Sequence, residues 1–228
     1  MNQKQSTDSL FYKIAQYIYY FLLVNGYFLL SNLLIIALLL YIPISLSNLL
    51  IYVVGLLPTG ASITALFYAM GKLYREKTIS PTRDYWTAYK KNFIESSKYW
   101  LILLIVITVL LVDILFVLNR GWMILTIISI LLFLIVILSG IYAFSIVARF
   151  EVSLKNLIIF SVILIYQNKL KSLSHLSLLL AFALILYGFF TYAVLFTFAI
   201  AAYYFMRNNH SLLDKMEQAY SREEETLE

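Results

Sequence analysis

Long apolar runs separated by short polar stretches form the main pattern along the chain. Four of them have about the 20 residues that a helix needs to cross the apolar core of a bilayer. They cover residues 17–40, 49–70, 99–118 and 122–147. An uncharged turn around Pro43 joins the first two runs, and the segment "NRG" at 119–121 turns the chain between the last two. The pattern predicts an all-α fold, a polytopic bundle of transmembrane helices.

The last apolar block, from His175 to Met206, is too long for one upright span. Its 32 residues would form a helix of about 48 Å at ~1.5 Å per residue, whereas the core of a bilayer is ~30 Å thick. Two interpretations stay open: two short spans that break around residues 188–192, or one strongly tilted helix.

The basic residues favour two spans here. With six spans and the N-terminus inside, sixteen of the seventeen Lys and Arg residues lie on the inner side, and only Arg120 lies outside. Five spans, the alternative, would export three more basic residues. We therefore expect about six spans, with both termini in the cytoplasm. In this interpretation residues 1–210 form a single transmembrane domain, and residues 211–228 form a short cytoplasmic acidic tail that begins with a helix cap at Ser211.

Two segments have the pattern of helices that lie at a membrane surface. In residues 80–95, Ser80 is a predicted helix cap, Pro81 is the first helical residue, and aromatic residues recur on one face. These aromatic residues either rest at the level of the lipid headgroups or dock a partner protein. The candidate docking residues are Tyr85, Trp86, Tyr89, Lys90, Asn92 and Phe93. Residues 153–169 have too few unbroken apolar positions to span, and we place them on the inner face as well.

Composition supports a membrane protein. Of the 228 residues, 62% are hydrophobic and 13% are charged, and the mean hydropathy is +0.86, far outside the range of soluble domains. The net charge of +5 comes from Lys and Arg between the apolar runs, a pattern of membrane orientation and not of nucleic-acid binding. No cysteine is present, which excludes disulfides and thiolate chemistry.

Residues 55–70, "GLLPTGASITALFYAM", place a proline and two glycines inside an apolar run. Pro58 removes a backbone donor, and Gly55 and Gly60 loosen the chain on both sides, so we expect a helix break or kink here. The break would alternatively leave the backbone amides of residues 60–63 free to bind an anion or a partner's backbone, as in discontinuous transporter helices.

A stripe of small residues follows the break. Ala61, Ala65 and Ala69 recur at every fourth position, on one face of the expected helix. Such a stripe lets another helix approach closely, either within the chain or from a second copy of it.

Asp113 is the only formal charge expected within the apolar core. An unpaired carboxylate at that depth costs several kcal/mol, so Asp113 is a candidate functional residue. Arg120 lies two helical turns further along, and we predict that it folds back to form a structural pair with Asp113. The alternative is a proton or cation relay, for which no span supplies a second acidic residue.

The sequence has no motif that points to catalysis. A serine-nucleophile motif, a phosphate-binding glycine loop and an HExxH pair are all absent. His175 and His210, the two histidines, have hardly any neighbours of metal-ligating type, and we assign them no role. We therefore expect a protein that is not an enzyme, with no catalytic residue, no cofactor and no metal.

The segments "LLPTGASITALFYAMGKLYRE" and "SPTRDYWTAYKKNF" carry a more specific pattern. Its residues are Pro58, Gly60, Ala65, Leu66, Tyr68, Lys72 and Arg75, followed by Pro81, Trp86, Tyr89, Lys90, Asn92 and Phe93. In these residues the chain resembles the YesL-like family of small bacterial polytopic membrane proteins, whose biochemical function is not established. One departure is a longer apolar stretch before the break, which holds Pro43 and two serines. The resemblance implies genomic company with carbohydrate ABC importers and glycan-degrading enzymes.

Together these observations predict a multi-pass protein of the bacterial cell membrane that is an accessory subunit or assembly factor of an oligosaccharide ABC importer. Its partners would be the lipid bilayer and the importer's permease or ATPase subunits, or a second copy of the chain. The alternative from a different class is a small autonomous secondary transporter or channel, with a site formed by the Pro58 break and Asp113.

Overall fold

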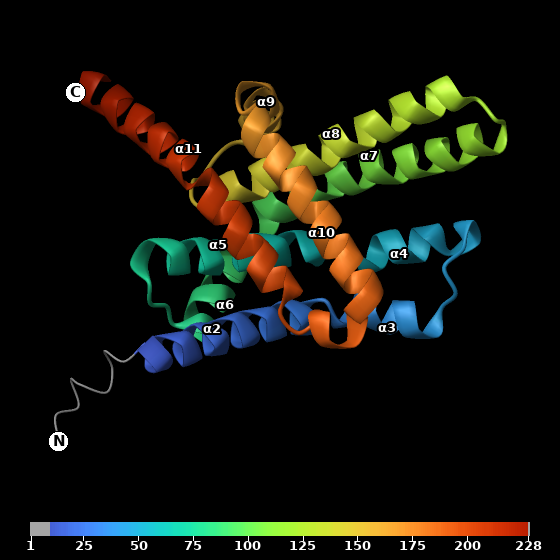
Figure 1. Ribbon diagram of the computed structural model, residues 1–228. Coiled ribbons are helices and arrows are strands. Elements are labelled where there is room, and N and C mark those ends of the chain that lie inside the picture. Colours follow the sequence, from blue (N-terminus) through green and yellow to red (C-terminus); the bar gives the residue numbers. More distant parts are fainter. Residues whose placement is uncertain (1–9, 228) are drawn as a thin grey trace.

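The computed structural model describes residues 10–227, apart from the side chains of residues 10, 190–192 and 220–227, and residues 1–9 and 228 lie outside it. Within that range the chain consists of helices joined by short connections (Figure 1). The first half contains α2 (Leu10–Ser31), α3 (Leu33–Tyr41), the short 3-10 helix η1 (Leu46–Asn48), α4 (Leu49–Gly55), α5 (Thr59–Glu76) and α6 (Pro81–Lys91). The second half contains α7 (Phe93–Asn119), α8 (Met123–Val147), α9 (Leu154–Gln167), α10 (Lys169–Ala193) and α11 (Thr197–Leu227).

Four of the described helices are long and apolar enough to cross a membrane. They cover Phe11–Ser31, Phe93–Asn119, Met123–Val147 and Lys169–Phe189. A bent pair, Leu46–Gly55 and Thr59–Glu76, meets the same criterion together and counts as a fifth candidate. The protein is therefore an all-helical, multi-pass membrane protein, with four or five candidate spans in the described part of the chain, where the charge pattern predicts about six.

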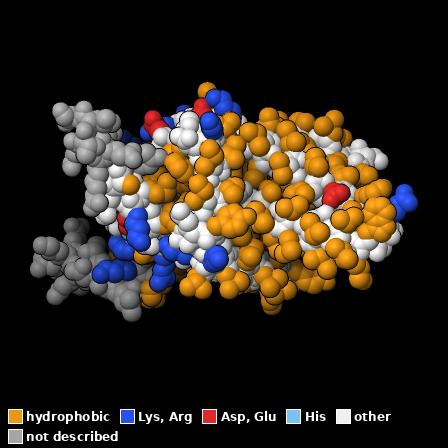
Figure 2. Space-filling view, turned by 90° about the horizontal axis from the view of Figure 1, so that it is seen from above, with side chains coloured by type: hydrophobic (Ala, Val, Ile, Leu, Met, Phe, Trp, Pro, Cys, Tyr) orange, Lys and Arg blue, Asp and Glu red, His pale blue; other side chains and the backbone are white. Residues whose placement is uncertain are grey.

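Charged and apolar side chains separate along the molecule. In Figure 2, Lys and Arg side chains gather toward the end from which both termini leave, and hydrophobic side chains cover most of the rest of that face. The turns between α3 and α4 and between α7 and α8 lie at the opposite end (Figure 1). This separation fits helices that cross a bilayer and carry most of their basic residues on one side.

Helix α5 is the centre of the bundle. It contacts α2, α6, α7, α8 and α11, and twelve of its eighteen residues are buried. Helix α6, by contrast, is short and packs across α2 and α5. The residues that resemble the YesL-like family therefore lie in the middle of the fold.

Both helices of the first hairpin are interrupted. The predicted first span, residues 17–40, is divided into α2 and α3 at Asn32, a break that the sequence pattern did not indicate. The second is divided into α4 and α5 around Pro58, where the proline and its glycines predicted a break, and the helix axis bends by 50° there. Beyond the breaks the hairpin packs little against the rest of the bundle, since α3 has no buried residue.

The last apolar block folds back on itself. Phe189 has non-helical backbone angles, α10 ends at Ala193 and α11 begins at Thr197, so the block is not one tilted helix. The α10–α11 turn does not reach the end of the molecule at which the α7–α8 turn lies (Figure 1). Helix α11 then continues to Leu227, so Ser211 lies within a helix and does not cap a new one. A continuous helix is favoured there because no Gly or Pro interrupts residues 197–227.

Candidate functional site

The two helix breaks meet at one level of the bundle and satisfy each other's polar groups. The Thr59 hydroxyl donates a hydrogen bond of 2.6 Å to Asn32 Oδ1, and the Asn32 amide donates to the Phe28 carbonyl at 2.8 Å. Both polar side chains are buried. The Trp100 indole of α7 donates to the Leu56 carbonyl, 2.7 Å away. Backbone acceptors that a helix break exposes at membrane depth thus find partners inside the chain.

Backbone donors at the start of α5 are also engaged. The Thr59 amide donates to the Leu56 carbonyl at 3.0 Å, and the Ser62 amide donates to the Pro58 carbonyl at 3.3 Å. The Ser62 hydroxyl reaches the same carbonyl at 3.0 Å. Of the amides at 60–63 that we considered for anion binding, that of Ser62 is therefore already used within the helix.

The small residues around the break allow helices to pack closely. A Cβ atom on Gly60 would clash with Trp100 of α7, and one on Gly55 would clash with a methyl group of Leu38. The alanine stripe is fully buried: Ala61, Ala65 and Ala69. In this structure the stripe therefore serves packing within the chain, and it presents no surface to a second copy.

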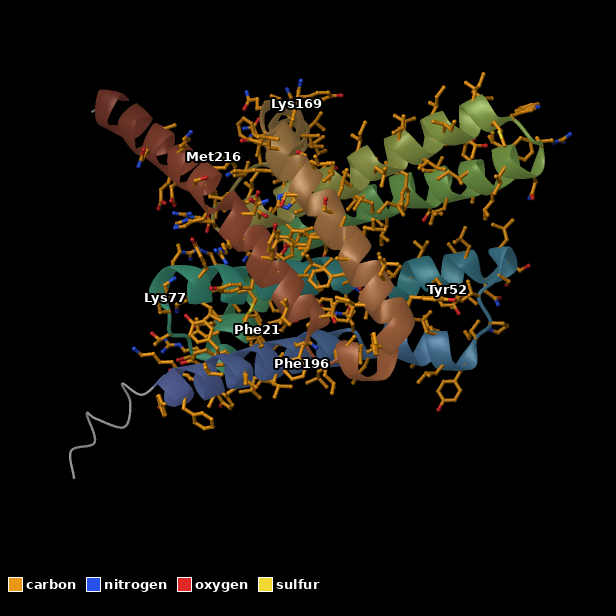
Figure 3. All side chains as sticks on the ribbon, in the orientation of Figure 1. Phe21, Tyr52, Lys77, Lys169, Phe196 and Met216 are labelled. Atoms are coloured by element: carbon orange, nitrogen blue, oxygen red, sulfur yellow. The ribbon has the colours of Figure 1, made fainter. Side chains whose placement is uncertain are left out.

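Asn25 holds the α10–α11 turn against α2. Its amide donates to the Val194 carbonyl at 2.9 Å, and its Oδ1 accepts from the Ala199 amide at 3.0 Å. The side chain has no exposed surface. Phe196, in the same turn, lies beside α2 in Figure 3. The sequence shows Asn25 as a polar residue in an apolar run, but its partners are far along the chain and no local pattern identifies them.

His175 belongs to a buried polar network that links α8, α10 and α11. Its Nε2 lies 3.0 Å from Asn209 Oδ1, and the Asn209 amide donates to the Ser145 hydroxyl at 3.0 Å. The Tyr142 ring packs edge-on to the imidazole, with ring centroids 5.3 Å apart. His175 and Asn209 have no exposed surface. Sequence reasoning missed this role, because a histidine near the start of an apolar block resembles a residue at the membrane surface.

A cavity of about 500 Å³ lies between α5, α7, α8, α10 and α11. Aliphatic and aromatic side chains form nearly all of its wall, with Thr59 and Thr197 as the hydroxyl-bearing residues and no charged residue among them. A wall of this kind suits hydrocarbon and offers an ion or a sugar very few polar partners.

Helix α6 begins as the sequence predicts, with Ser80 before it and Pro81 as its first residue. Capping comes from a residue one turn on: the Ser80 amide donates to Asp84 Oδ2 at 2.9 Å. The other Asp84 oxygen accepts from the Lys72 ammonium of α5, also at 2.9 Å. This ion pair attaches α6 to the central helix.

Much of the candidate docking face on α6 packs inside the chain. Tyr85 is fully buried with its hydroxyl 2.7 Å from the Ser31 hydroxyl, and burial raises the pKa of this phenol above its usual range. Of the remaining candidates, Trp86, Tyr89 and Asn92 are half-buried, and Lys90 and Phe93 are exposed. Only the last two offer an extended surface to a partner.

Asp113 lies on the part of the α7–α8 hairpin that stands apart from the bundle, residues 105–137, which we call the outer hairpin. Its Oδ2 accepts a hydrogen bond of 2.6 Å from the buried Ser129 hydroxyl of α8, and the Asp113 side chain itself is exposed. The predicted pair with Arg120 is not formed. Arg120 caps α7 in a helical backbone conformation, but its guanidinium turns to the Phe116 ring, 5.3 Å from the centroid, and not to Asp113.

Few side chains of the outer hairpin are buried. Its buried residues are Val117, Thr126 and Ser129. The neighbours of Asp113 on its own helix include the exposed apolar residues Val109, at 61%, and Phe116, at 53%. The carboxylate therefore stands on a surface that otherwise suits lipid.

The fold and the site define an all-helical, multi-pass membrane protein whose helix breaks are closed from within. Residues 21–114 match the model of a family described as a protein of unknown function, DUF624. The match begins within α2, ends within α7 at residue 114, and confirms the resemblance to the YesL-like family that the residues around Pro58 indicate. No curated protein and no solved structure matches the chain.

Proposed function

We propose that this protein is a non-enzymatic accessory or assembly subunit that binds another membrane protein through its outer hairpin, with a carbohydrate ABC importer as the partner. One observation carries the proposal: the Asp113 carboxylate is exposed on an apolar surface at membrane depth, where its hydrogen-bond partner in the chain is Ser129. Intramembrane carboxylates face a protein interior or a polar cavity because lipid cannot solvate them.

The depth of Asp113 follows from its place in the helix. It lies six residues before the end of α7 at Asn119, or about 9 Å along the axis at ~1.5 Å per residue. Long side chains of Lys and Arg reach the interface from such a depth, but an aspartate is too short to do so. A partner helix that covers the outer hairpin would remove the carboxylate from lipid and supply further hydrogen-bond donors.

The choice of an ABC importer rests on the YesL-like resemblance, which implies genomic company with carbohydrate importers. The permease of such an importer spans the membrane, and its helices could pack against the outer hairpin. Its ATPase lies at the cytoplasmic surface, where the exposed Lys90 and Phe93 of α6 would form a second contact.

Affinity purification from the native bacterial membrane tests this function. The tagged wild-type protein should bring down importer subunits in near-stoichiometric amounts, and Asp113→Asn should lose most of them while remaining folded and inserted. Ile185→Asn is a matched control, because it places an amide on an exposed apolar position of α10, outside the outer hairpin. Recovery of the wild-type protein alone, under conditions that keep a known membrane complex intact, would contradict the proposal.

The meeting of the two helix breaks favours a second candidate, an autonomous transporter or channel, since broken helices often surround transport sites. Its site would combine the Pro58 break with Asp113. This candidate predicts solute flux through the purified protein in liposomes and loss of that flux in Asp113→Asn. The internal pairing of Asn32 with Thr59 and the apolar cavity make it the weaker of the two.

The proposed topology has both termini in the cytoplasm, with α10 and α11 counted as the fifth and sixth spans. The gathering of Lys and Arg at one end, and the return of the chain at the α10–α11 turn, support this orientation. A C-terminal reporter that works only in the cytoplasm should be active. An expressed but silent fusion would contradict the even number of spans.

A further inference from the structure

A second cavity, of about 380 Å³, lies where the end of α9 and the start of α10 face α11. Figure 3 shows this region between Lys169, the first residue of α10, and Met216 of α11. Its lining residues are Leu164, Gln167, Asn168, Lys171, Ser211, Leu212, Lys215, Met216 and Ala219. Among these nine residues the charged groups are the ammonium groups of Lys171 and Lys215, and there is no carboxylate.

The acidic residues of α11 that are close to Lys215 in sequence pair with a different cation, the guanidinium of Arg149. Asp214 Oδ1 lies 2.7 Å from Arg149 Nη2, and Glu217 also pairs with this guanidinium. Asp214 and Glu217 are three residues apart and share one face of the helix. Lys215 lies between these two acids in sequence and lines the cavity together with Lys171. The fold thus separates the Lys215 ammonium group from the carboxylates next to it in sequence.

Polar groups of the cavity are placed to bind an anion. The Lys171 ammonium donates to Ser211 Oγ at 2.7 Å, so the Ser211 hydroxyl keeps its own hydrogen for a ligand. Gln167 and Asn168 also line the cavity, and the Asn168 side-chain amide donates one of its hydrogens to the Leu164 carbonyl at 3.3 Å. Two ammonium groups, a hydroxyl and amides are the donors that phosphate oxygens accept.

The apolar side of the cavity indicates what the phosphate is attached to. Leu164, Leu212 and Met216 line it beside the lysines. The preceding helix α9 exposes Val162 and Tyr166, at 38% and 62%, along a surface that suits lipid. Basic pockets between helices at the cytoplasmic end of a bundle recognise anionic lipid headgroups. We propose that this cavity binds a phosphate group, supplied by the headgroup of an anionic phospholipid.

Photolabelling of the full-length protein in vesicles tests this site. The vesicles contain phosphatidylcholine and a trace of photoactivatable phosphatidylglycerol, and mass spectrometry locates the label. Labelling should concentrate on residues 164–171 and 211–219 and should fall roughly tenfold in Lys171→Gln/Lys215→Gln, since each lysine near a membrane surface strengthens anionic lipid binding several-fold. Thermal unfolding in detergent checks that the variant stays folded.

A matched control removes the same charge elsewhere. Lys13→Gln/Lys155→Gln changes two exposed lysines outside the cavity and should label like the wild type. Equal labelling of the wild type and Lys171→Gln/Lys215→Gln, or an equal loss in both double variants, would overturn the proposal.

Millimolar inorganic phosphate distinguishes the two sources of the anion. Loss of labelling on its addition would show that free phosphate also occupies the site. Unchanged labelling, together with the loss in Lys171→Gln/Lys215→Gln, would assign the site to the lipid headgroup.

Discussion

The two ends of α7 lie in very different surroundings. At the inner end, the Ser96 hydroxyl is 2.7 Å from the Thr64 hydroxyl, both side chains are fully buried, and the Trp100 indole closes the break at Leu56. At the outer end, Asp113 reaches one hydroxyl, that of Ser129, and is otherwise exposed on an apolar surface. At the inner end the polar groups have their hydrogen-bond partners within the chain. At the outer end the Asp113 carboxylate is exposed, and under the proposed function a second molecule would supply further hydrogen-bond donors.

This difference distinguishes polar residues that stabilise the fold from Asp113, which is proposed to contact a partner. Asn25, Asn32 and Thr59 lie at membrane depth and are all hydrogen-bonded inside the bundle. Their loss would leave buried backbone or side-chain groups unpaired. Loss of the Asp113 carboxylate would leave the buried Ser129 hydroxyl without its acceptor. It would also remove the free-energy cost of placing a carboxylate in lipid.

The largest expected effect is at the tightest helix contact. Gly60→Leu forces a side chain into Trp100, and we expect a loss of about 3 kcal/mol or more in the free energy of unfolding, or no folded protein. The measurement is unfolding of the purified protein in mixed micelles. Gly26→Leu is the control, because a Cβ on Gly26 would have nothing within 4 Å. Equal stability of the two variants would show that α5 and α7 do not approach as closely as described.

A smaller loss is expected at the α10–α11 turn. Asn25→Ala removes the partner of the Val194 carbonyl and of the Ala199 amide, and should cost about 1–3 kcal/mol. Ser177→Ala removes a hydrogen bond to the Leu173 carbonyl at an exposed site of α10 and should change the stability by no more than about 0.5 kcal/mol. The same unfolding assay compares them. If Asn25→Ala is as stable as Ser177→Ala, the turn is not held by this side chain.

The smallest effect on stability is expected in the outer hairpin. Ser129→Ala removes the hydroxyl that donates to Asp113, and the free energy of unfolding in micelles should change by less than about 1 kcal/mol, since water and detergent headgroups reach the exposed carboxylate. Co-purification of the partner should nevertheless weaken, because the carboxylate loses its fixed orientation. A large loss of stability would instead assign Asp113 and Ser129 to the group of residues that hold the fold.

The sequence predicts those features that depend on short-range pattern. Apolar runs of about 20 residues indicate the helices, Pro58 indicates the second break, and Ser80 with Pro81 indicates the start of α6. Asn32 gives no such signal, because asparagine is tolerated inside helices and its role depends on Thr59 of the next helix. The break at Asn32 is therefore visible only when the two helices lie side by side.

Hydrogen-bond partners that are far apart along the chain could not be predicted from the sequence for the same reason. Asn25 and Val194 are 169 residues apart, and nothing local connects them. For Asp113 the sequence indicated an unusual charge at depth, but the predicted partner, Arg120, was wrong. A spacing of seven residues places two side chains on one helical face, but it does not determine which neighbour each one contacts. Arg120 packs over Phe116, and Asp113 accepts a hydrogen bond from Ser129 of the next helix.

Site-specific photocrosslinking in the native membrane tests the central claim most directly. A photoreactive residue in place of Val109, one turn from Asp113 and 61% exposed, would report what covers the outer hairpin, and one in place of Leu180 on α10 serves as the reference. The account predicts a crosslink from position 109 to another membrane protein, an importer subunit under the proposed function, and its loss on adding Asp113→Asn. Crosslinks to lipid alone at position 109, or a protein crosslink that Asp113→Asn leaves unchanged, would contradict it.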